Sequence, residues 1–354
     1  LNGRRLAAQK RRLEKIVDER TREIQEQKEE LQEKNEDLEG ANKTISQQKE
    51  EVEKAHAELS EAHQEITDSI DYAQKIQHAL LQNEEYISDH LPEHFLLFKP
   101  QAQVSGDFYW ARQKNGFLYL AAVDCTGHGV PGAFMSMLGV SLLNEIMSSE
   151  ELLSPGEVLT RLRKRVVREL SGSDPEGGAK DGMDAAMVRI PLGNSSSDPN
   201  SKGDEGIQVQ FAGAQNPLYV IRKGIGQDPT DPEDLSGLSE KRLKPFKKSP
   251  DGIEIKGDPM PVGYDEHAKG DFSTIDLQLR KGDMLYIFSD GYADQFGGPK
   301  GKKFRYGPFK ELLIRVHENP LEEQKKELDR VFRDWKQESR QEQIDDVLVM
   351  GISL

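Results

Sequence analysis

Cysteine, long apolar runs and positive charge are scarce in this chain of 354 residues. The single cysteine, Cys125, excludes an internal disulfide and fits a reducing compartment. No run of about 18 apolar residues occurs, so the sequence predicts no membrane-spanning helix. Lys and Arg number 48 against 63 Asp and Glu, and the net charge of −15 argues against nucleic acid as the main partner, because its phosphates would be repelled.

Proline is absent from residues 13–82, where Gly40 is the one glycine. Apolar side chains recur there at every seventh position: Val17, Ile24, Leu31, Leu38, Ile45, Val52, Leu59, Ile66 and Ala73. A seven-residue repeat of this length is specific for a left-handed coiled coil. A lone helix of about 100 Å with one apolar stripe would not persist in water, so we expect a parallel homodimer through residues 1–82.

The apolar stripe fills only one of the two core positions of each heptad, and the other core position is mostly polar or small in either register. If the stripe occupies the d positions, the a positions are Thr21, Lys28, Asn35, Asn42, Lys49, His56 and His63. If the stripe occupies the a positions, the d positions are Arg20, Gln27, Lys34, Ala41, Gln48, Ala55 and Ala62. Polar and small residues in a seam lower stability but help to specify register and a two-stranded state. We therefore expect a marginal, adjustable stalk that regulates the domain after it through dimer geometry.

The chain begins at Leu1 without a signal-peptide pattern, so we expect a fragment of a longer protein. Its first residues carry a basic cluster: Arg4, Arg5, Lys10, Arg11 and Arg12. Basic residues often flank the cytoplasmic end of a membrane span, so an upstream sensor or membrane domain is one explanation. A solvated helix start explains the cluster equally well. We expect a cytoplasmic location, alone or as the cytosolic part of a membrane-anchored protein.

The pattern changes after the heptads end. Residues 83–92 predict a linker with a short helix, because Asn83 can cap the helix and Pro92 ends it. Residues 93–354 alternate short apolar strand patterns with amphipathic helices, and we expect them to form one domain.

Two aspartates lie at the ends of two neighbouring strands. Asp107 precedes Phe108–Trp110, and Asp124 follows the apolar run Phe117–Val123. Asn115-Gly116 between the runs is a strong hairpin signal. The strands should therefore pair antiparallel and bring both carboxylates to one end of a sheet. Either aspartate alone could be a turn cap, so the interpretation depends on whether other carboxylates converge there.

Further acidic residues stand at two later strand boundaries. Asp290 follows the buried-strand pattern of residues 284–288, and Asp345-Asp346 precedes that of residues 347–352. No histidine or cysteine cluster accompanies these sites. Carboxylates without nitrogen or sulfur ligands favour hard divalent cations, so the sequence predicts a Mg²⁺ or Mn²⁺ site.

These motifs resemble a known family. Residues 106–107 (GD), 124–134 (DCTGHGVPGAF), 289–291 (SDG) and 345–346 (DD) occur in the order seen in the PPM-type (type 2C) metal-dependent serine/threonine phosphatases. The string from Asp124 looks most like the bacterial branch typified by the sporulation stage II E and sigma-B regulator phosphatases. The resemblance spans residues 93–354 and implies an α+β fold: a four-layer αββα sandwich, two antiparallel sheets flanked by helices, here preceded by the long α-helical coiled coil.

The resemblance also implies the site. Asp107 and Asp124 would share two Mn²⁺ or Mg²⁺ ions, the Cys125 backbone carbonyl would add a ligand, and Asp290 and Asp345 would complete the second ion's shell. Asp107, Asp124 and Asp290 would then be catalytic through a water activated by two metals. The implied substrate is a phosphoserine or phosphothreonine on a phosphoprotein regulator, such as an anti-sigma-factor antagonist of the STAS type.

The remaining site expectations concern regulation and phosphate binding. Gly127, His128, Gly129 and Phe134 belong to an element that resembles the one that switches with partner state in that branch. Lys99 is a candidate phosphate-binding cation, although packing or solvation explains that lysine as well. The alternative to an enzyme is a catalytically silent module with this fold that binds partners.

Overall fold

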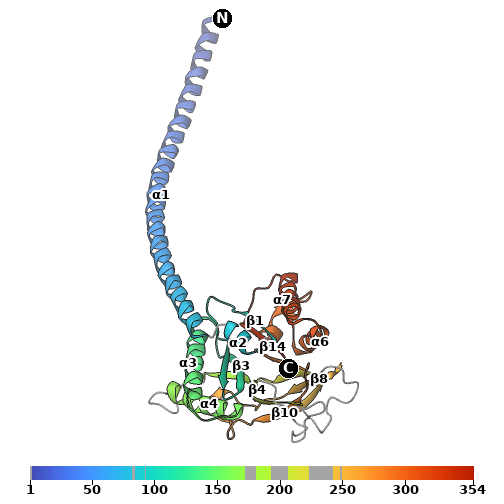
Figure 1. Cartoon of the computed structure of the whole chain (residues 1–354). Coiled ribbons are helices and arrows are strands. Elements are labelled where there is room, and N and C mark those ends of the chain that lie inside the picture. The colour runs from blue at the N-terminus through green and yellow to red at the C-terminus, as the bar shows by residue number, and fades with distance from the viewer. Residues whose placement is uncertain are drawn as a thin grey trace, which may run out of the picture. The chain divides into compact units, whose positions relative to one another are not determined.

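The computed structural model describes residues 2–81, 84–91, 93–171, 181–192, 206–222, 242–247 and 249–354. The chain divides into two compact units, Leu1–Ser69 and Ile70–Leu354, which we call the helical unit and the globular unit. The helix α1 (Asn2–Leu80) forms the first and contributes its last turns to the second (Figure 1). The globular unit thus includes the last turns of α1, and the predicted division at residues 82 and 92 stays a prediction.

The helical unit confirms the long helix expected from the heptads. The stripe residues are exposed in the single chain; Ile24 and Leu31, for example, are 62% and 61% exposed. Ion pairs one turn apart, such as Lys34–Glu30 at 2.6 Å, add a few tenths of a kcal/mol each, roughly, to an isolated helix. The apolar stripe is therefore uncovered within one chain, and dimerisation stays a prediction.

Two antiparallel sheets build the globular unit. The first sheet contains, in spatial order, β1 (His94–Lys99), β14 (Val347–Ser353), β11 (Met284–Phe288), β6 (Leu218–Ile221), β8 (Ser249–Ile255) and β7 (Leu243–Phe246). The second contains β10 (Ile275–Leu279), β5 (Ile207–Ala214), β4 (Gly182–Pro191), β3 (Phe117–Cys125) and β2 (Phe108–Lys114), with β9 (Val262–Gly263) paired to β4.

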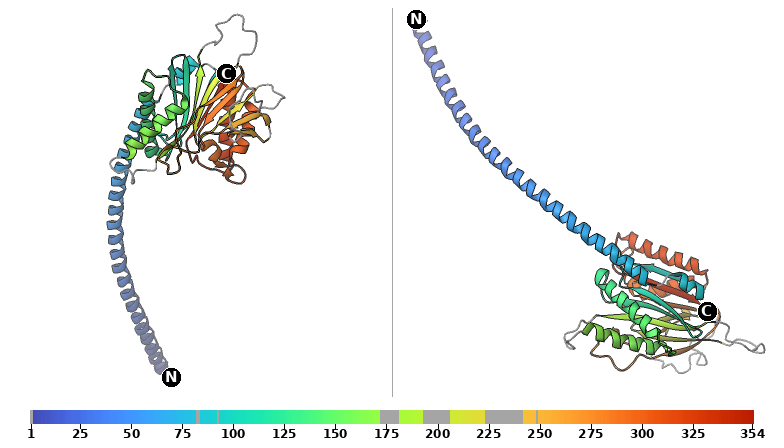
Figure 2. Two further views of the ribbon diagram at one scale, coloured as in Figure 1. Left: turned by 90° about the horizontal axis from the view of Figure 1, so that it is seen from below. Right: turned by 60° about the vertical axis from the view of Figure 1, so that its left-hand side comes forward.

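Helices cover the outer faces of both sheets (Figure 2). Apolar residues of α3 (Gly129–Met147) and α4 (Pro155–Ser171) pack on the second sheet, and those of α6 (Tyr306–Val316) and α7 (Leu321–Glu338) pack on the first. A third apolar cluster joins the inner faces of the two sheets. The predicted four-layer αββα sandwich is confirmed. Because strands such as β3 are covered on both sides, their sequences are apolar throughout rather than alternating.

The short elements complete the unit. These are α2 (Glu84–His90), α5 (Gly291–Asp294), β12 (Phe296–Gly297) and β13 (Lys302–Lys303). The predicted hairpin is confirmed: β2 pairs with β3 from Phe108 opposite Val123, and Asn115 and Gly116 have φ of 48° and 79°. Two consecutive left-handed residues match the right-handed twist of the strands.

Two long polar stretches of this domain, residues 193–206 and 224–252, have the composition of loops. The one over residues 193–206 lies outside the described residues except for Gly206. The one over residues 224–252 contains more structure than the sequence indicated, because β7 and part of β8 lie within it. The sequence of β7 is Leu-Lys-Pro-Phe, and its Lys244 and Pro245 indicate a loop when the sequence is considered alone. Both residue types also occur on edge strands, and β7 is the edge strand of its sheet.

The helix α3 is apolar and 19 residues long, enough by length and composition alone to cross a membrane. More than half of its best apolar window is buried inside the globular unit. It is therefore explained as a core helix, and among the described residues no other helix passes this test.

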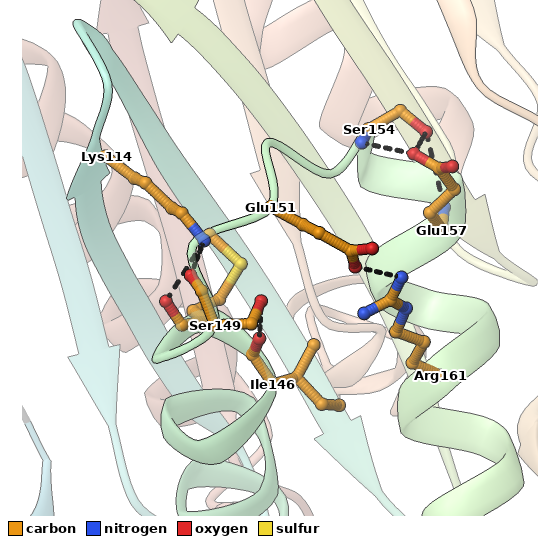
Figure 3. Close-up of polar contacts among 8 residues, drawn as sticks. Lys114, Ile146, Ser149, Glu151, Ser154, Glu157 and Arg161 are labelled. Carbon is orange, nitrogen blue, oxygen red and sulfur yellow. Dashed lines mark hydrogen bonds and ion pairs between the residues drawn. The ribbon is translucent and has the colours of Figure 1, made fainter.

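The connection from α3 to α4 is held by polar contacts at both helix ends (Figure 3). The Lys114 ammonium donates hydrogen bonds to the carbonyls of Met147 and Ser149, where the helix terminus favours a cation. Ser154 and Glu157 form a capping box at the start of α4: the Ser154 N–H donates to Glu157 Oε2 at 2.7 Å. These contacts explain why the two helices keep their places on the second sheet.

Candidate active site

Carboxylates from both sheets line one cavity at the edge of the sandwich. The cavity has a volume of about 230 Å³ and is lined by Asp124, Cys125, Thr126, Gly127, His128, Asp184, Asp290 and Asp345. Asp124 belongs to β3 in the second sheet, whereas Asp290 follows β11 and Asp345 precedes β14 in the first. The structure thus brings together three of the predicted aspartates, which lie up to 221 residues apart in the chain (Asp124 to Asp345).

Asp184 is a further cavity residue that the sequence reasoning missed. It lies in β4 directly opposite Asp124 in the antiparallel β3–β4 pair. Like charges at opposed positions destabilise a sheet, so this pair is costly without a counter-charge. The one available signal was its place at the start of the apolar run of residues 185–188, the same strand-boundary position as the other aspartates.

The surroundings shift these carboxyl groups strongly. Burial, followed by the charges of Asp107 and Asp290, raises the pKa of Asp124 to about 10. Burial and then Asp290 raise the pKa of Asp184 to about 6. The pKa values of Asp290 and Asp345 are also raised, in each case first by burial. A group of acids in this state gains most from a bound cation, because a cation stabilises the ionised forms.

Asp107 is buried beside this cavity, with 2% of its surface exposed. Burial raises its pKa, with the charges of Asp346 and Asp345 adding to the effect and a hydrogen bond with Ser289 opposing it. Its Oδ2 is buried and has no hydrogen-bond partner among the described residues. A buried carboxylate oxygen without a donor is costly unless a cation binds it, so Asp107 fits a ligand position.

The lining therefore suits hard divalent cations, because it holds four carboxylates and His128 as its single imidazole. Within the described ranges, no three His, Cys, Asp or Glu side chains are already gathered round one point. The cavity supplies the ligands along its walls rather than in a closed cage. The Cys125 side chain is buried in the core beneath this wall, which leaves its backbone as the part available to the cavity.

Comparison with known proteins agrees with this geometry. The SiaA-PP2C domain of Pseudomonas aeruginosa superposes with a TM-score of 0.62 at 28% sequence identity, over 83% of this chain and 98% of that one. Residues 247–354 match the model of the Stage II sporulation protein E (SpoIIE) family. The globular unit has a PP2C-like fold.

A second solved structure, the PP2C phosphatase domain of SpoIIE from Bacillus subtilis with a fragment of its regulatory domain, shares the fold. Its TM-score is 0.50 at 17% identity, covering 73% of this chain and 62% of that one. No curated protein matched the chain. The predicted resemblance to type 2C phosphatases of the SpoIIE kind is thus confirmed.

The two adjacent acids of the last motif have different places in this PP2C-like domain. Asp345 lines the cavity, whereas Asp346 is 2% exposed and accepts hydrogen bonds from the backbone N–H groups of Gln101 and Gly106, both at 2.7 Å. Asp346 thereby holds the segment that leads into Asp107. Asp345 is therefore the member of the pair that lies on the cavity, and its role as a metal ligand stays a prediction.

Lys99, the candidate phosphate-binding residue, lies outside the lining of the acidic cavity. Its ammonium forms an ion pair with Asp329 of α7 at 2.6 Å, and it is not among the cavity-lining residues. Lys303 is closer to the acids: it pairs with Asp294 at 2.7 Å and lowers the pKa of Asp290, against the larger effect of burial. The position of Lys99 gives no support to its predicted role in phosphate binding, because the sequence did not reveal that Asp329 would neutralise this lysine.

The predicted regulatory residues surround the start of α3. Gly127 and Gly129 have φ of 84° and 66°, His128 lines the cavity, and Phe134 is 64% exposed on the helix surface. Their regulatory role stays a prediction. What the PP2C-like domain shows is that the turn of residues 127–129 forms both the cavity wall and the beginning of α3.

Two glycines, Gly106 and Gly132, allow this turn to approach the segment that carries Asp107. A Cβ atom on Gly132 would lie 2.8 Å from Gly106 Cα and would collide with the carbonyl oxygen of Gly127. A Cβ atom on Gly106 would lie 2.6 Å from the same oxygen. The glycine at position 132 therefore has a packing reason.

Gly132→Ala is expected to destabilise the globular unit by about 1–3 kcal/mol, because the new methyl group has no space between the two backbones. Urea unfolding followed by circular dichroism measures the change. Gly40→Ala is the control, since a Cβ there meets nothing within 4 Å. It should stabilise the helix by about 1 kcal/mol. Equal stability of Gly132→Ala and the wild type would contradict the tight approach.

One more residue missed by the sequence reasoning is Gln77, near the end of α1. Its side chain is 4% exposed, and its Nε2 donates to the Ser105 carbonyl at 2.6 Å and to Ser136 Oγ of α3 at 2.8 Å. Its Oε1 accepts from the Ser105 N–H at 3.1 Å. One amide thus joins α1, the segment before Asp107, and α3. Nothing in the heptad pattern distinguishes this glutamine from the solvated ones.

Proposed function

We propose that the chain is a divalent-metal-dependent protein serine/threonine phosphatase. The observation that carries this proposal is the convergence of Asp124, Asp184, Asp290 and Asp345 from two sheets on one cavity, with Asp107 buried beside it. Phosphomonoester hydrolysis is among the slowest uncatalysed reactions, and a cluster of hard-cation ligands suits it.

The carboxylates have distinct tasks in this proposal. Asp107, Asp124, Asp290 and Asp345, with the Cys125 carbonyl, would hold two Mn²⁺ or Mg²⁺ ions. Bound divalent ions lower the pKa of water and stabilise charge on a phosphoryl group. Asp346 keeps Gly106 in place through its backbone N–H, and that hydrogen bond positions Asp107. The β3–β4 register keeps Asp184 beside Asp124.

Cysteine chemistry is a poor alternative for this site. The one cysteine, Cys125, is 4% exposed, and burial raises the pKa of its thiol further above its ordinary value. A phosphatase that forms a cysteinyl intermediate needs a thiolate, which requires a lowered pKa and access to solvent. A hydrolytic route without a covalent enzyme intermediate fits the residues better.

The substrate in this proposal is a phosphoserine or phosphothreonine on a protein regulator of the STAS type, acted on in the cytoplasm. The family resemblance of the motifs supports this class. The cavity supports it too, since its carboxylates are only partly buried and remain accessible, as a phosphorylated residue on a folded protein requires.

The test is phosphate release from such a phosphoprotein and from p-nitrophenyl phosphate with Mn²⁺. Asp290→Asn should lower kcat/KM about 100-fold or more, since a neutral amide is a poor ligand for a hard cation. Asp276→Asn is the matched control, because Asp276 is an exposed residue of β10 that pairs with Gln210. Equal rates in Asp290→Asn and the wild type would falsify the proposal. Calorimetry without saturable Mn²⁺ binding would favour a silent binding module.

We further propose that the stalk pairs with a second copy and regulates the domain. Support comes from the exposed heptad stripe of α1 and from Gln77, which links the end of α1 to the segment before Asp107. Truncation should be made at Ile70, where the globular unit begins, because a cut near residue 91 would also remove Gln77.

The full chain should be a dimer in analytical ultracentrifugation, and the chain starting at Ile70 should be a monomer with turnover changed about threefold or more. Turnover should rise on truncation if the paired stalk inhibits the domain, and fall if the paired stalk activates it. Replacing two stripe residues by charged ones, Leu31→Lys and Leu38→Lys, in the full chain should have the same effect as truncation. Glu36→Lys, which lies outside the stripe, is the control. Identical oligomeric states and rates in all four proteins would remove this proposal.

A further inference from the structure

A second hollow lies beside the acidic cavity, between the β7–β8 hairpin and α6. It has a volume of about 590 Å³, and its apolar surface comes mainly from Pro245, Phe246, Tyr306 and Ile314. Grooves of this size with an apolar floor and a few charged groups are typical of ligand sites. We call it the hairpin groove.

Tyr306, which lines the hairpin groove, lies near the acidic site: burial and then the charges of Asp290 and Asp294 raise the pKa of its phenol. The backbone N–H of Arg305 donates to the Ala293 carbonyl at 2.6 Å, which ties the start of α6 to the turn that begins at Asp290. The Tyr306 ring lies 6.4 Å from that of Phe288, two residues before Asp290. A peptide bound at the acids can therefore continue into the groove.

Lysines give this groove a charge unlike that of the rest of the chain. Lys310 has a structural role: its ammonium forms an ion pair with Glu254 at 2.5 Å and lies 5.0 Å from the centre of the Phe246 ring. Lys244 is half exposed, 3.8 Å from the same glutamate, and Lys247 is exposed. Glu311 also lines the groove. Two accessible ammonium groups thus flank an apolar floor in a protein of net charge −15.

Strand addition is a poor way to use this region. β7 is the edge strand of its sheet, but Pro245 in its middle has no N–H to offer to another strand. Recognition here must come from side chains. An apolar side chain would fill the groove, and an acidic one would meet Lys244 and Lys247.

We propose that the hairpin groove binds the segment that flanks the phosphorylated residue of the protein substrate, and that it selects an apolar residue next to an acidic one. This inference rests on the proposed phosphatase function and deepens it by naming the substrate sequence class. The lysines have a clear purpose here: the carboxylate-lined site repels acidic peptides, and the groove offsets that repulsion where the peptide leaves the site.

The test uses phosphoserine peptides in a Gly/Ser background, in which a Leu-Asp pair is moved stepwise from two to eight residues away on either side. The wild type should prefer one placement over the plain background peptide by about tenfold or more in kcat/KM. Lys244→Glu/Lys247→Glu should abolish this preference through KM and leave p-nitrophenyl phosphate turnover within about twofold. Lys281→Glu/Lys326→Glu, with the same charge change on exposed lysines outside the groove, is the matched control.

The outcomes separate this inference from the proposed function. If the wild type hydrolyses the peptides without a preference, or the preference survives the double charge reversal, the groove assignment is overturned and the phosphatase stands. If nothing is hydrolysed, the phosphatase proposal fails, and fluorescence anisotropy with the unphosphorylated Leu-Asp peptides decides the groove. Binding that the Lys244→Glu/Lys247→Glu variant loses supports it, and absence of binding overturns it. Ile314→Ala, which only enlarges the floor, should weaken peptide binding about threefold or more.

Discussion

Asp124→Asn is expected to lower kcat/KM for phosphate release by about 1000-fold or more and yet to stabilise the metal-free protein. The two effects have one cause. The side chain lies among acids that raise its pKa to about 10, compared with 3.8 for an ordinary aspartate. A group so placed is costly to fold when no cation is bound, and asparagine removes that cost.

The sign of the effect follows from proton binding. Below pH 4 the carboxyl is protonated in both the folded and the unfolded state. Between pH 4 and about 10 the folded state keeps the proton and the unfolded state loses it, so stability falls as pH rises through this window. At pH 7 the cost is on the order of a few kcal/mol. Asp184, with a pKa of about 6, adds to the fall between pH 4 and 6.

Thermal unfolding in chelator at pH 5 to 9 measures this prediction. The Tm of the wild type should fall steadily as the pH rises. The Tm of Asp124→Asn should fall less and should exceed that of the wild type by roughly several degrees at pH 8. Saturating Mn²⁺ should restore the wild type and not the variant, since the metal binds the ionised form. Asp276→Asn should follow the wild type. A variant less stable than the wild type at pH 8 in chelator would show that the acids do not repel each other as the geometry indicates.

Gln77→Leu should lower kcat about tenfold or more while dimerisation is unchanged. The change to an apolar side chain leaves the Ser105 N–H without its partner, whereas the Ser105 carbonyl and Ser136 Oγ lose one hydrogen bond each and keep the one between them. A buried N–H left unpaired costs about 1–3 kcal/mol, and the segment that carries Asp107 is free to shift. Steady-state assays with Mn²⁺ measure kcat, and sedimentation measures dimerisation.

Gln64→Leu is the matched control, because that glutamine is exposed in the helical unit and bonds only to Asp68. Raising Mn²⁺ concentration distinguishes the cause: a displaced Asp107 should weaken Mn²⁺ binding, so part of the lost kcat should return at high Mn²⁺. A loss of activity that is accompanied by monomer formation, or that does not respond to Mn²⁺, would assign Gln77 to the stalk rather than to the site.

The sequence alone determined those features whose signals are local. Heptads predicted α1 because each stripe residue is defined by spacing along one helix. Asn115-Gly116 predicted the hairpin because the turn requires two left-handed residues in succession. Aspartates beside apolar runs predicted ligands because strand ends meet at sheet edges.

Only the tertiary structure decided which polar groups find each other. Asp184 meets Asp124 through strand register, Asp346 binds Gly106 across 240 residues, and Lys99 is neutralised by Asp329 across 230. Gln77 looks like any solvated stalk glutamine until its burial is known. Hydrogen bonds and ion pairs between distant residues depend on how layers pack, and no pattern of neighbouring residues encodes that packing.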